Sequence, residues 1–349
     1  MKYNYIFFNV PDNRWGRDTN GYYTICIADL ERMDNVQIVS KPMEHKSKFW
    51  QILRRVHTSH SLNNILKWRK DDLWYPYWMK LRFNPEEPLC FVFCCGYEEL
   101  GYFRYLREKY NNCRIVKLHR DKVSVFLDGH EDFDSVYNGK IKSPYDLLYL
   151  FDENEAKKYN GIYTPLISFN SKIYINKLDR YPLSDVFFAG RAKNRLPKLM
   201  EMYEKLTKLG LKVEYYLTDV PLEKRKDFPG IKYSNKILPY KEMLYRSVNS
   251  RCMLDINQKG SNGYTQRFLE ALMYNKKLIT DNDKIKNIQL YNGKYIKHVN
   301  DIDITIKDFI LNDMVVDYKY NNNFSPVRLI EDIDNRLCIM DEKEMRRHD

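Results

Sequence analysis

Residues 185–217 read DVFFAGRAKNRLPKLMEMYEKLTKLGLKVEYYL. Two short apolar runs, 185–189 and 212–217, are typical of buried strands. Between them, apolar side chains recur at helical spacing until Gly210, where a helix is expected to end. A strand, a helix and a second strand in this order predict a parallel sheet with a crossover helix.

The same alternation extends in both directions. Toward the C-terminus it predicts a helix, a strand, a helix and a strand over residues 240–248, 252–256, 265–274 and 277–280. In the first half it predicts strands over 3–10, 89–95 and 114–118, with a helix over 97–110. The expected domains are an N-terminal α/β domain, a linker, a C-terminal α/β domain and a C-terminal helix with a tail: 1–165, 166–182, 183–320 and 321–349.

The composition is that of a globular protein. Of 349 residues, 44% are hydrophobic and 15% aromatic, which excludes a disordered chain. No run approaches the roughly 18 apolar residues of a membrane-spanning helix, and the opening apolar run is too short for a signal peptide. Seven cysteines without C-x-x-C spacing predict reduced core thiols and a cytoplasmic location. The net charge of +11 indicates an anionic partner.

A glycine-containing loop precedes one of the predicted helices in QKGSNGYTQRFLEALMYNKKLITDN, residues 258–282. Unpaired N–H groups and the positive end of the dipole make such a helix start an anion site, and Gly260 and Gly263 would let a phosphate approach the backbone. Glu270, farther along this helix, is placed to accept hydrogen bonds from a ribose diol. The alternative is that Gly263 only makes a turn and Glu270 is a solvated helix residue.

A second candidate segment is FFAGRAKNR, residues 187–195. The strand ends at Gly190, and three cations follow before the next helix: Arg191, Lys193 and Arg195. This position is the carboxyl edge of the sheet, where open α/β sheets bind ligands. Arginine forks bind two phosphate oxygens at once, so the cations favour a phosphate ligand. The alternative is an ordinary basic surface loop.

These segments resemble GT-B glycosyltransferases, in particular those of bacterial capsular, exopolysaccharide and O-antigen gene clusters. The resemblance rests on FLEALMYNKKLITDN, DVFFAGRAKNR, ILPYKEMLYRSVNSRCMLDI and GYTQRFLEAL, and on the upstream YLFDENEAKKYNGIYTPL and VHTSHSLNNILKWRKDDLWYPYW. It covers residues 49–337. It implies an α/β fold of two Rossmann-like domains with an interdomain cleft, the first domain on the acceptor side and the second binding a nucleotide sugar.

The resemblance also implies roles for individual residues. Glu270 would bind the ribose, Tyr264, Thr265 and Gln266 the diphosphate, and the loop from Tyr233 to Tyr240 the base. The complete expected donor site comprises Gly190, Arg191, Lys193, Arg195, Tyr233, Ile237, Tyr240, Asn262, Gly263, Tyr264, Thr265, Gln266, Arg267 and Glu270. Retaining members usually carry an acidic residue eight positions before the ribose-binding one. That position is Asn262 here, which favours an inverting mechanism.

An inverting transfer needs a general base for the acceptor hydroxyl. His119, after the strand 114–118, is one candidate, and Asp12 and Asp18, after the first strand, are its rivals. A lone histidine is more often structural, so the choice stays open. D-x-D pairs occur at four places, too many to indicate a metal site, and no dinucleotide or P-loop motif is present. We therefore expect no metal and no cofactor.

A basic, aromatic patch spans residues 41–82 and contains four of the five tryptophans. The residues singled out for a membrane surface or an acceptor are Trp50, Arg54, Arg55 and Trp68. Cations attract anionic lipid and tryptophan settles at the headgroup level. A core-packed helix with a solvated basic face explains the pattern equally well. No RNA-binding motif accompanies the patch, so no nucleic-acid partner is expected.

The sequence thus predicts a glycosyltransferase that moves a sugar from a UDP- or GDP-linked donor to a glycan or lipid-linked glycan acceptor. The context that the resemblance implies is bacterial surface polysaccharide synthesis, in the cytoplasm or on the inner face of the plasma membrane. The alternative is a non-catalytic nucleotide- or polyanion-binding protein with the same fold.

Overall fold

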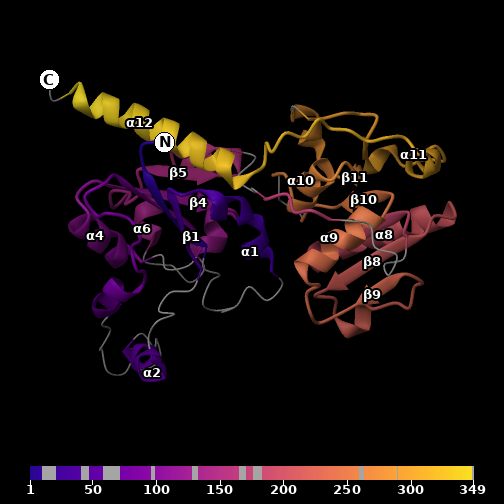
Figure 1. Cartoon of the computed structure of the whole chain (residues 1–349). Coiled ribbons are helices and arrows are strands. Elements are labelled where there is room, and N and C mark those ends of the chain that lie inside the picture. The colour runs from indigo at the N-terminus through magenta and orange to yellow at the C-terminus, as the bar shows by residue number, and fades with distance from the viewer. Residues whose placement is uncertain are drawn as a thin grey trace. The chain divides into compact units, whose positions relative to one another are not determined.

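The structure, a computed structural model, describes residues 1–9, 21–40, 47–57, 71–95, 99–127, 133–164, 170–175, 183–258, 263–288 and 290–347. The chain divides into two compact units. Unit 1 comprises Met1–Arg17, Ala28–Ile167 and Val327–Asp349, and unit 2 comprises Asp18–Ile27 and Ser168–Pro326. Each unit is an α/β fold built on one parallel sheet (Figure 1).

The sheet of unit 1 has six strands in the order β2-β1-β3-β4-β5-β6. Every neighbouring pair is parallel. The central strands are almost continuous apolar runs, as expected for strands covered on both faces. Their bounds are β1 Asn4–Asn9, β2 Val36–Val39, β3 Leu89–Cys95, β4 Cys113–His119, β5 Leu147–Leu150 and β6 Ile162–Tyr163.

Helices complete unit 1, and its main core is aromatic. Phe8 stacks on Phe93 at 4.5 Å between ring centroids, and Trp78 lies 4.5 Å from Tyr102. The helices are α2 Lys48–His57, α4 Leu100–Lys109, α5 Val123–Leu127, α6 Asp134–Tyr137, α7 Glu153–Lys158 and α12 Pro326–Met345, with 3-10 turns η1 Ala28–Arg32 and η2 Asp71–Tyr77.

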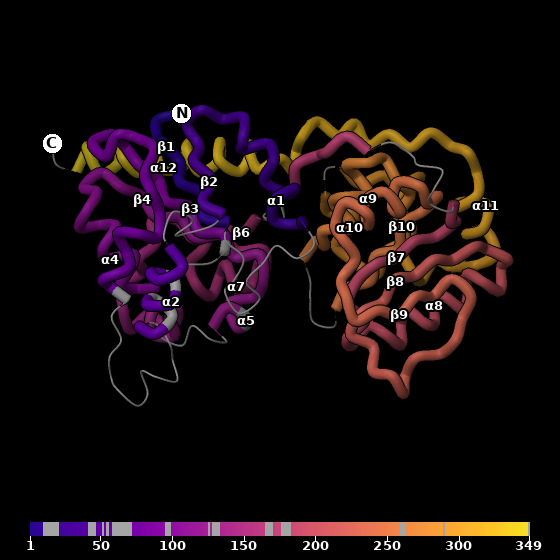
Figure 2. Tube along the Cα trace, turned by 60° about the horizontal axis from the view of Figure 1, so that its bottom comes forward, coloured from indigo at the N-terminus to yellow at the C-terminus, as the bar shows by residue number. Residues whose placement is uncertain are grey.

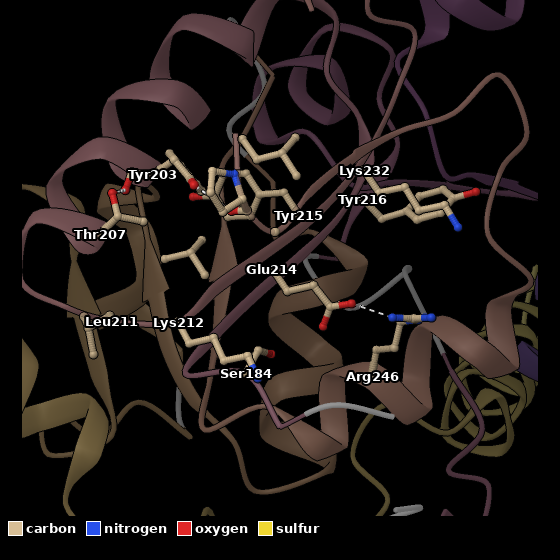
Figure 3. Close-up of a pocket in the computed structure, with 14 residues that line it drawn as sticks. Ser184, Tyr203, Thr207, Leu211, Lys212, Glu214, Tyr215, Tyr216, Lys232 and Arg246 are labelled. Atoms are coloured by element: carbon tan, nitrogen blue, oxygen red, sulfur yellow. Dashed lines mark hydrogen bonds and ion pairs between the residues drawn. The ribbon is translucent and has the colours of Figure 1, made fainter. Parts of the chain in front are cut away.

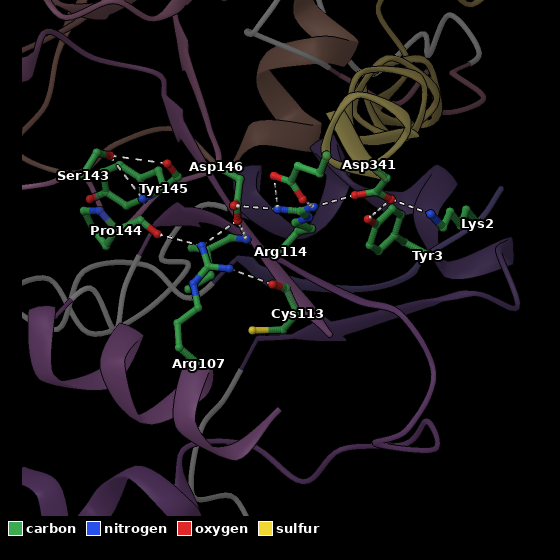
Figure 4. A network of polar contacts seen from close by, with 12 residues as sticks. Lys2, Tyr3, Arg107, Cys113, Arg114, Ser143, Pro144, Tyr145, Asp146 and Asp341 are labelled. Carbon is green, nitrogen blue, oxygen red and sulfur yellow. Dashed lines mark hydrogen bonds and ion pairs between the residues drawn. The ribbon is translucent and has the colours of Figure 1, made fainter. Parts of the chain in front are cut away.

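Helix α12 follows unit 2 in the sequence but belongs to unit 1, where ion pairs attach it to the sheet. Arg114, at the start of β4, donates to Asp341 and Glu344 of α12, at 2.6 Å each (Figure 4). Its other terminal nitrogen lies 3.3 Å from Asp146. Tyr3 donates to Asp341 at 2.5 Å. The last helix is therefore a fixed part of the first unit.

The sheet of unit 2 has the order β12-β11-β10-β7-β8-β9, again with every neighbouring pair parallel. Figure 2 shows β10, β7, β8 and β9 following one another in this order. In chain order this is the doubly wound arrangement of dinucleotide-binding folds. The strands are β7 Val186–Arg191, β8 Val213–Thr218, β9 Ile231–Tyr233, β10 Cys252–Asp255, β11 Lys277–Thr280 and β12 Ile296–His298.

The helices of unit 2 bury apolar side chains. In α8, Leu199, Met202, Tyr203 and Leu206 recur at helical spacing and pack against β8. The helices are α1 Tyr22–Cys26, α8 Leu196–Lys208, α9 Tyr240–Asn249, α10 Gln266–Met273 and α11 Ile306–Leu311, with 3-10 turns η4 Lys193–Arg195, η5 Leu222–Lys224, η6 Asp283–Asn287 and η7 Val299–Asp301.

The predicted class, two Rossmann-like α/β domains, is confirmed. The division into units differs from the expected domains at two places. Residues 18–27 group with unit 2, because Ser171 donates backbone and side-chain hydrogen bonds to the Cys26 carbonyl. The C-terminal helix groups with unit 1 through the contacts of Arg114. Of the six cysteines whose side chains the structure describes, five are buried and all six are free thiols.

Candidate functional site

The sheet of unit 2 reverses its strand order between β7 and β10. The chain builds β8 and β9 on one side of β7 and then returns to place β10, β11 and β12 on the other. Ligands of open α/β sheets bind outside the carboxyl ends of the strands at such a switch point. Here these ends are Arg191 in β7 and Asp255 in β10. This edge is therefore the first place to look for a ligand site.

Two arginines from different helical elements meet at this edge. Arg195 ends η4, just after β7, and Arg267 lies in the first turn of α10. Both guanidinium groups lie over the ring of Phe188, with Cζ 5.1 Å and 4.3 Å from the ring centroid. Stacking on an aromatic face holds a guanidinium without using its N–H groups. The Phe188 ring therefore orients the guanidinium groups of both arginines.

Gly190 leaves the space that these arginines occupy. A Cβ atom built at this position would stand 3.1 Å from the terminal nitrogen of Arg195 and 3.1 Å from that of Arg267. The φ angle of Gly190 is +154°, a value that residues other than glycine rarely adopt. A larger residue would thus strain the backbone and displace two cations at once.

The two arginines differ in how their charges are balanced. Arg267 forms an ion pair with the fully buried Asp255 at 3.2 Å and donates to the Ala189 carbonyl at 2.6 Å. Arg195 donates to the carbonyls of Arg191 and Ile256, at 2.9 Å and 2.7 Å. Among the residues that the structure describes, no carboxylate lies within ion-pair distance of Arg195. The positive charge of Arg195 is available to a bound anion.

The pKa of Arg195 reflects this surplus of cations. Burial lowers it, the charge of Arg267 lowers it further, and Asp255 and Asp281 offset part of the effect, giving a pKa of about 10. Arg195 therefore stays protonated at neutral pH. An anion between the two guanidinium groups would relieve their mutual repulsion.

Asp255 holds both Arg267 and the start of α10 in place. It accepts hydrogen bonds from the hydroxyls of Thr265 and Thr280, at 2.7 Å and 3.1 Å. Thr265 in turn caps the helix by accepting from the N–H of Phe268 at 3.1 Å. The carboxylate of Asp255, at the end of β10, thus holds both the cap of α10 and Arg267. The start of α10 therefore lies at the same edge of the sheet as Arg195.

Glu270, the predicted ribose ligand, is 1% exposed. Its carboxylate accepts a hydrogen bond from the Tyr240 hydroxyl at 2.7 Å, and that hydroxyl accepts one from Asn170 at 2.5 Å. Burial raises the pKa of Glu270 to about 7, although Tyr240 and Arg267 act in the opposite direction. Glu270 is therefore a buried acid that titrates near neutral pH, and the alternative of a solvated helix residue is wrong.

The amide of Gln266 lies next to this network. Its Oε1 accepts from the Tyr22 hydroxyl of α1 at 3.1 Å, and its Nε2 is buried without a hydrogen-bond partner among the described residues. The ring of Tyr22 packs edge-on against Tyr240, 5.0 Å between centroids. A buried amide donor left without a partner is unfavourable and favours a ligand at this helix start.

The remaining predicted donor residues lie around this centre. Arg191 and Lys193 are exposed, and Arg191 lies 3.6 Å from Asp219. The Tyr264 ring stacks on Phe268 at 5.0 Å, and its hydroxyl donates to the backbone carbonyl of Lys284. The buried Gly263 accepts from the Asn282 amide at 3.2 Å. Asn262 lies outside the described residues.

The three predicted residues of the expected base-binding loop differ in their exposure to solvent. Tyr240 is buried at the start of α9, as described above. Tyr233 is half-buried, with Arg225 over its ring at 5.9 Å. Ile237 is 44% exposed and offers an open apolar surface. Only Ile237 of these three is presented to solvent.

The candidate base His119 lies in unit 1, at the end of β4. It is 3% exposed, hydrogen-bonded to the Tyr137 hydroxyl, and packed edge-on against Phe126 at 5.0 Å. Asp12 and Asp18 lie outside the described residues. The burial of His119 favours a structural role for it.

The predicted membrane helix exposes its apolar stripe. Phe49, Ile52 and Val56 of α2 are 67%, 60% and 42% exposed, and only Leu53 of this stripe packs against the main core. Trp50 is 43% exposed, 6.1 Å from Trp74. Arg54 and Arg55 lie in α2, but the structure does not describe their side chains. Trp68 lies outside the described residues. Helix α2 therefore contacts the core through Leu53 and leaves most of its apolar stripe exposed.

Sequence reasoning missed two residues of the site, Asp255 and Phe188. Both lie in strands already predicted, and an aspartate closing the apolar run CMLD was the available signal for the first. In the part of the chain that the structure describes, no group of three or more His, Cys, Asp or Glu residues could hold a metal ion. No described helix is long and apolar enough to span a membrane.

No protein-family model matches the chain, and a comparison with curated proteins found no match. Solved structures with a similar arrangement include OtsA in its apo form, 12% identical, with a TM-score of 0.46 over 89% of this chain and 92% of that one. The UDP-GlcNAc 2-epimerase of Methanocaldococcus jannaschii is 12% identical, with a TM-score of 0.44 over 96% and 100%. A UDP-forming trehalose-phosphate synthase of Burkholderia xenovorans is 12% identical, with a TM-score of 0.43 over 90% and 92%. At these values the likeness concerns the arrangement of the chain alone.

Proposed function

We propose that unit 2 binds the diphosphate of a UDP- or GDP-linked sugar and that the protein is a glycosyltransferase. The observation that carries this proposal is the pair of guanidinium groups, Arg195 and Arg267, held together over Phe188 beside Gly190. They lie at the switch point of a doubly wound sheet, where such folds bind nucleotides.

A diphosphate fits this pair better than a single carboxylate. Each fork can bind two phosphate oxygens, and the start of α10 adds N–H groups beside them. These groups take up the charge that develops on a leaving nucleoside diphosphate. Arg191 and Lys193, exposed at the same edge, extend the cationic surface toward the sugar. The proposed transfer needs no metal ion and no cofactor.

The nucleoside would extend from the diphosphate along α10. Glu270 lies one turn beyond Arg267 and would receive the ribose hydroxyls, once the Tyr240 hydroxyl releases its carboxylate. The unpartnered Nε2 of Gln266 supplies a donor between phosphate and ribose. Ile237 offers its exposed side chain to the base.

Transfer with inversion requires a base on the acceptor side. His119 is buried, which argues against it as the base, and Asp12 and Asp18 are the other two candidates for this role. The base would take the acceptor hydroxyl proton while the bond from the anomeric carbon to the diphosphate breaks.

We infer that the acceptor is a lipid-linked or polymeric glycan presented at an anionic membrane, as in surface polysaccharide synthesis. The exposed stripe of α2, together with exposed Trp50, supplies apolar contacts for the headgroup region. The excess of basic residues between 41 and 82 supplies attraction to anionic lipid. The protein would then work at the inner face of the plasma membrane.

The donor site is tested by calorimetric titration of the full chain with UDP and GDP, then with the matching nucleotide sugars. We expect one of the two nucleotides to bind with a dissociation constant in the micromolar range, and Arg195→Gln to weaken it. Absence of binding by both nucleotides would overturn the proposal. Hydrolysis of the bound nucleotide sugar, lost in Asp18→Asn, separates an enzyme from a binder.

A further inference from the structure

A cavity of about 580 Å³ lies at the opposite end of the same strands (Figure 3). Its walls come from the last turns of α8, the first residues of β8 and β9, and Arg246 of α9. The volume is within the range of small-molecule sites. Because β8 has six residues, the two ends of the sheet are separated by roughly 20 Å. The cavity is therefore distinct from the proposed donor site.

The wall of the cavity is mostly apolar and aromatic. Tyr203 of α8 and Tyr215 of β8 are buried, with ring centroids 5.8 Å apart, and both line the cavity together with Val213 and Ile231. In Figure 3, Tyr203 and Thr207 lie on the helix at one side, and the ion pair of Glu214 with Arg246 lies at the other. A molecule with an apolar body would lie against this wall.

The charge at the rim is positive. Glu214 is neutralised by Arg246, and the side chains of both are 20% exposed. Lys212 and Lys232 line the same cavity and are exposed, with the Lys232 ammonium 5.5 Å from the Tyr216 ring centroid. Neither ammonium group pairs with a carboxylate among the residues in the description. An anionic group on the ligand would meet both.

Two buried hydroxyls among the lining residues also lack partners. Ser184 Oγ and Tyr215 Oη are buried, and within the described ranges neither forms a hydrogen bond. Buried polar atoms are nearly always hydrogen-bonded in folded proteins. Orphaned hydroxyls beside a cavity of this size favour a ligand that carries polar atoms into it.

We propose that this cavity binds a small amphipathic anion, with an aromatic or aliphatic body against the apolar part of its wall and one acidic group at Lys212 and Lys232. A nucleotide is the wrong occupant, because the only guanidinium in the cavity wall, that of Arg246, is committed to Glu214 and Glu242. The site goes beyond the proposed sugar transfer and is occupied independently of it.

The test uses 8-anilinonaphthalene-1-sulfonate, an amphipathic aromatic anion, titrated into the full chain with fluorescence as the readout. Lys232→Glu reverses a rim charge at an exposed position, and Thr207→Trp fills the cavity. The control Lys208→Glu makes the same charge change on an exposed residue of α8 that does not line the cavity.

We expect Lys232→Glu to weaken dye binding at least tenfold and Thr207→Trp to remove it, with Lys208→Glu within twofold of the wild type. Saturating UDP or GDP should leave dye binding unchanged. Unaltered affinity in Lys232→Glu would overturn the proposal even if Thr207→Trp does not fold. Displacement of the dye by a nucleotide would also overturn it, since the dye would then occupy the donor site.

Discussion

Arg195 and Arg267 direct their terminal nitrogens at the same point beside the backbone, each 3.1 Å from the place where a side chain at Gly190 would begin. Arg267 is paired with a carboxylate, and among the described residues Arg195 is not. Like charges this close repel one another, and a bound anion removes the repulsion. The predictions below follow from this arrangement and from the buried groups around it.

Replacing Gly190 with alanine should abolish nucleotide binding. The added Cβ would push both guanidinium groups from their positions and strain a backbone with φ of +154°. We expect the affinity for the nucleotide sugar to fall at least about 100-fold, the effect of losing two charge-assisted contacts. Calorimetric titration measures it.

Gly139→Ala is the matched control for this variant. Gly139 lies in unit 1 with φ of +77° and open space around its missing Cβ, so alanine there costs backbone strain alone, about 1 kcal/mol. Its nucleotide affinity should equal that of the wild type. Equal affinity in Gly190→Ala would show that the two arginines do not form the site.

Substitutions of Arg267 and Arg195 should differ in their effects on stability and on nucleotide binding. Arg267→Gln leaves the buried Asp255 without its counter-ion and should lower the free energy of unfolding by about 3 kcal/mol. Arg195→Gln leaves no carboxylate of the described residues without a partner, so its unfolding transition should stay close to that of the wild type. Its nucleotide affinity should nevertheless fall roughly 10- to 100-fold.

Urea unfolding and nucleotide titration of both variants provide the comparison. Arg328→Gln, which changes an exposed arginine of α12 outside the proposed donor site, serves as the control and should alter either quantity only slightly. A loss of stability in Arg195→Gln as large as that in Arg267→Gln would mean that Arg195 is a structural residue.

Glu270 should make the stability of the protein depend on pH. Its pKa is raised by burial to about 7 in the folded chain, above the ordinary value it has when unfolded. Between these two values the folded state holds the extra proton, so stability falls as pH rises from about 4.5 to 7 and is constant above that. The loss amounts to about 3 kcal/mol. Glu270→Gln should remove this slope in urea unfolding measured across the interval.

The same group should control nucleotide-sugar affinity. A ribose diol donates to an ionised carboxylate, so binding should tighten from pH 6 to pH 8. A nucleotide sugar is the better ligand here than a free diphosphate, whose own terminal phosphate titrates in this range. Affinity that stays constant with pH, or an unchanged slope in Glu270→Gln, would contradict the role of Glu270.

In unit 1, Arg114 should contribute most to the attachment of α12 to the sheet. It binds Asp341 and Glu344 of that helix and Asp146 of the sheet, with 18% of its side chain exposed. Arg114→Met should lower the free energy of unfolding by about 3 kcal/mol, because Asp341 and Asp146 lose a shared counter-ion. Arg328→Met, which breaks an exposed ion pair within α12, should cost less than about 0.5 kcal/mol. Urea unfolding distinguishes them.

The pH dependence of this attachment has the opposite sign to that of Glu270. Burial raises the pKa of Asp341, but hydrogen bonds from Lys2, Tyr3 and Arg114 outweigh burial and leave it below its usual value. The stability it contributes is complete above the ordinary aspartate pKa and is lost as pH falls through the lowered one. The difference between Arg114→Met and the wild type should therefore shrink in acid.

The membrane proposal is tested by co-sedimentation with vesicles containing anionic lipid. Ile52→Glu places a charge in the exposed stripe of α2 and should reduce binding severalfold without unfolding the chain, because Ile52 is 60% exposed. Ile304→Glu, at an exposed apolar residue of unit 2, is the control. Equal sedimentation of both variants would remove α2 as the contact.

Strands and helices of unit 2 could be predicted from the sequence because their apolar residues alternate in long, regular patterns. β11 has the predicted bounds, as β3 of unit 1 does, while β9 and β12, with three residues each, are too short to leave a pattern. Arg195 was predicted from its place after a strand. Its pairing with Arg267 over Phe188 depends on two segments far apart in the chain, which no local pattern contains.

Burial was the property that local patterns predicted least well. Glu270 and His119 lie at positions where chemistry was expected, and both are enclosed by aromatic side chains contributed by other elements. The apolar stripe of α2 shows the reverse. Its helical spacing is that of a buried face, yet three of its four residues are exposed. Periodicity identifies an apolar face and leaves open what covers it.

A crystal structure of the full chain with bound UDP or GDP tests the proposed donor site most directly. The diphosphate oxygens should lie within hydrogen-bond distance, about 3 Å, of the guanidinium nitrogens of both Arg195 and Arg267, beside Gly190. A diphosphate bound elsewhere, with these two arginines free of it, would contradict the assignment.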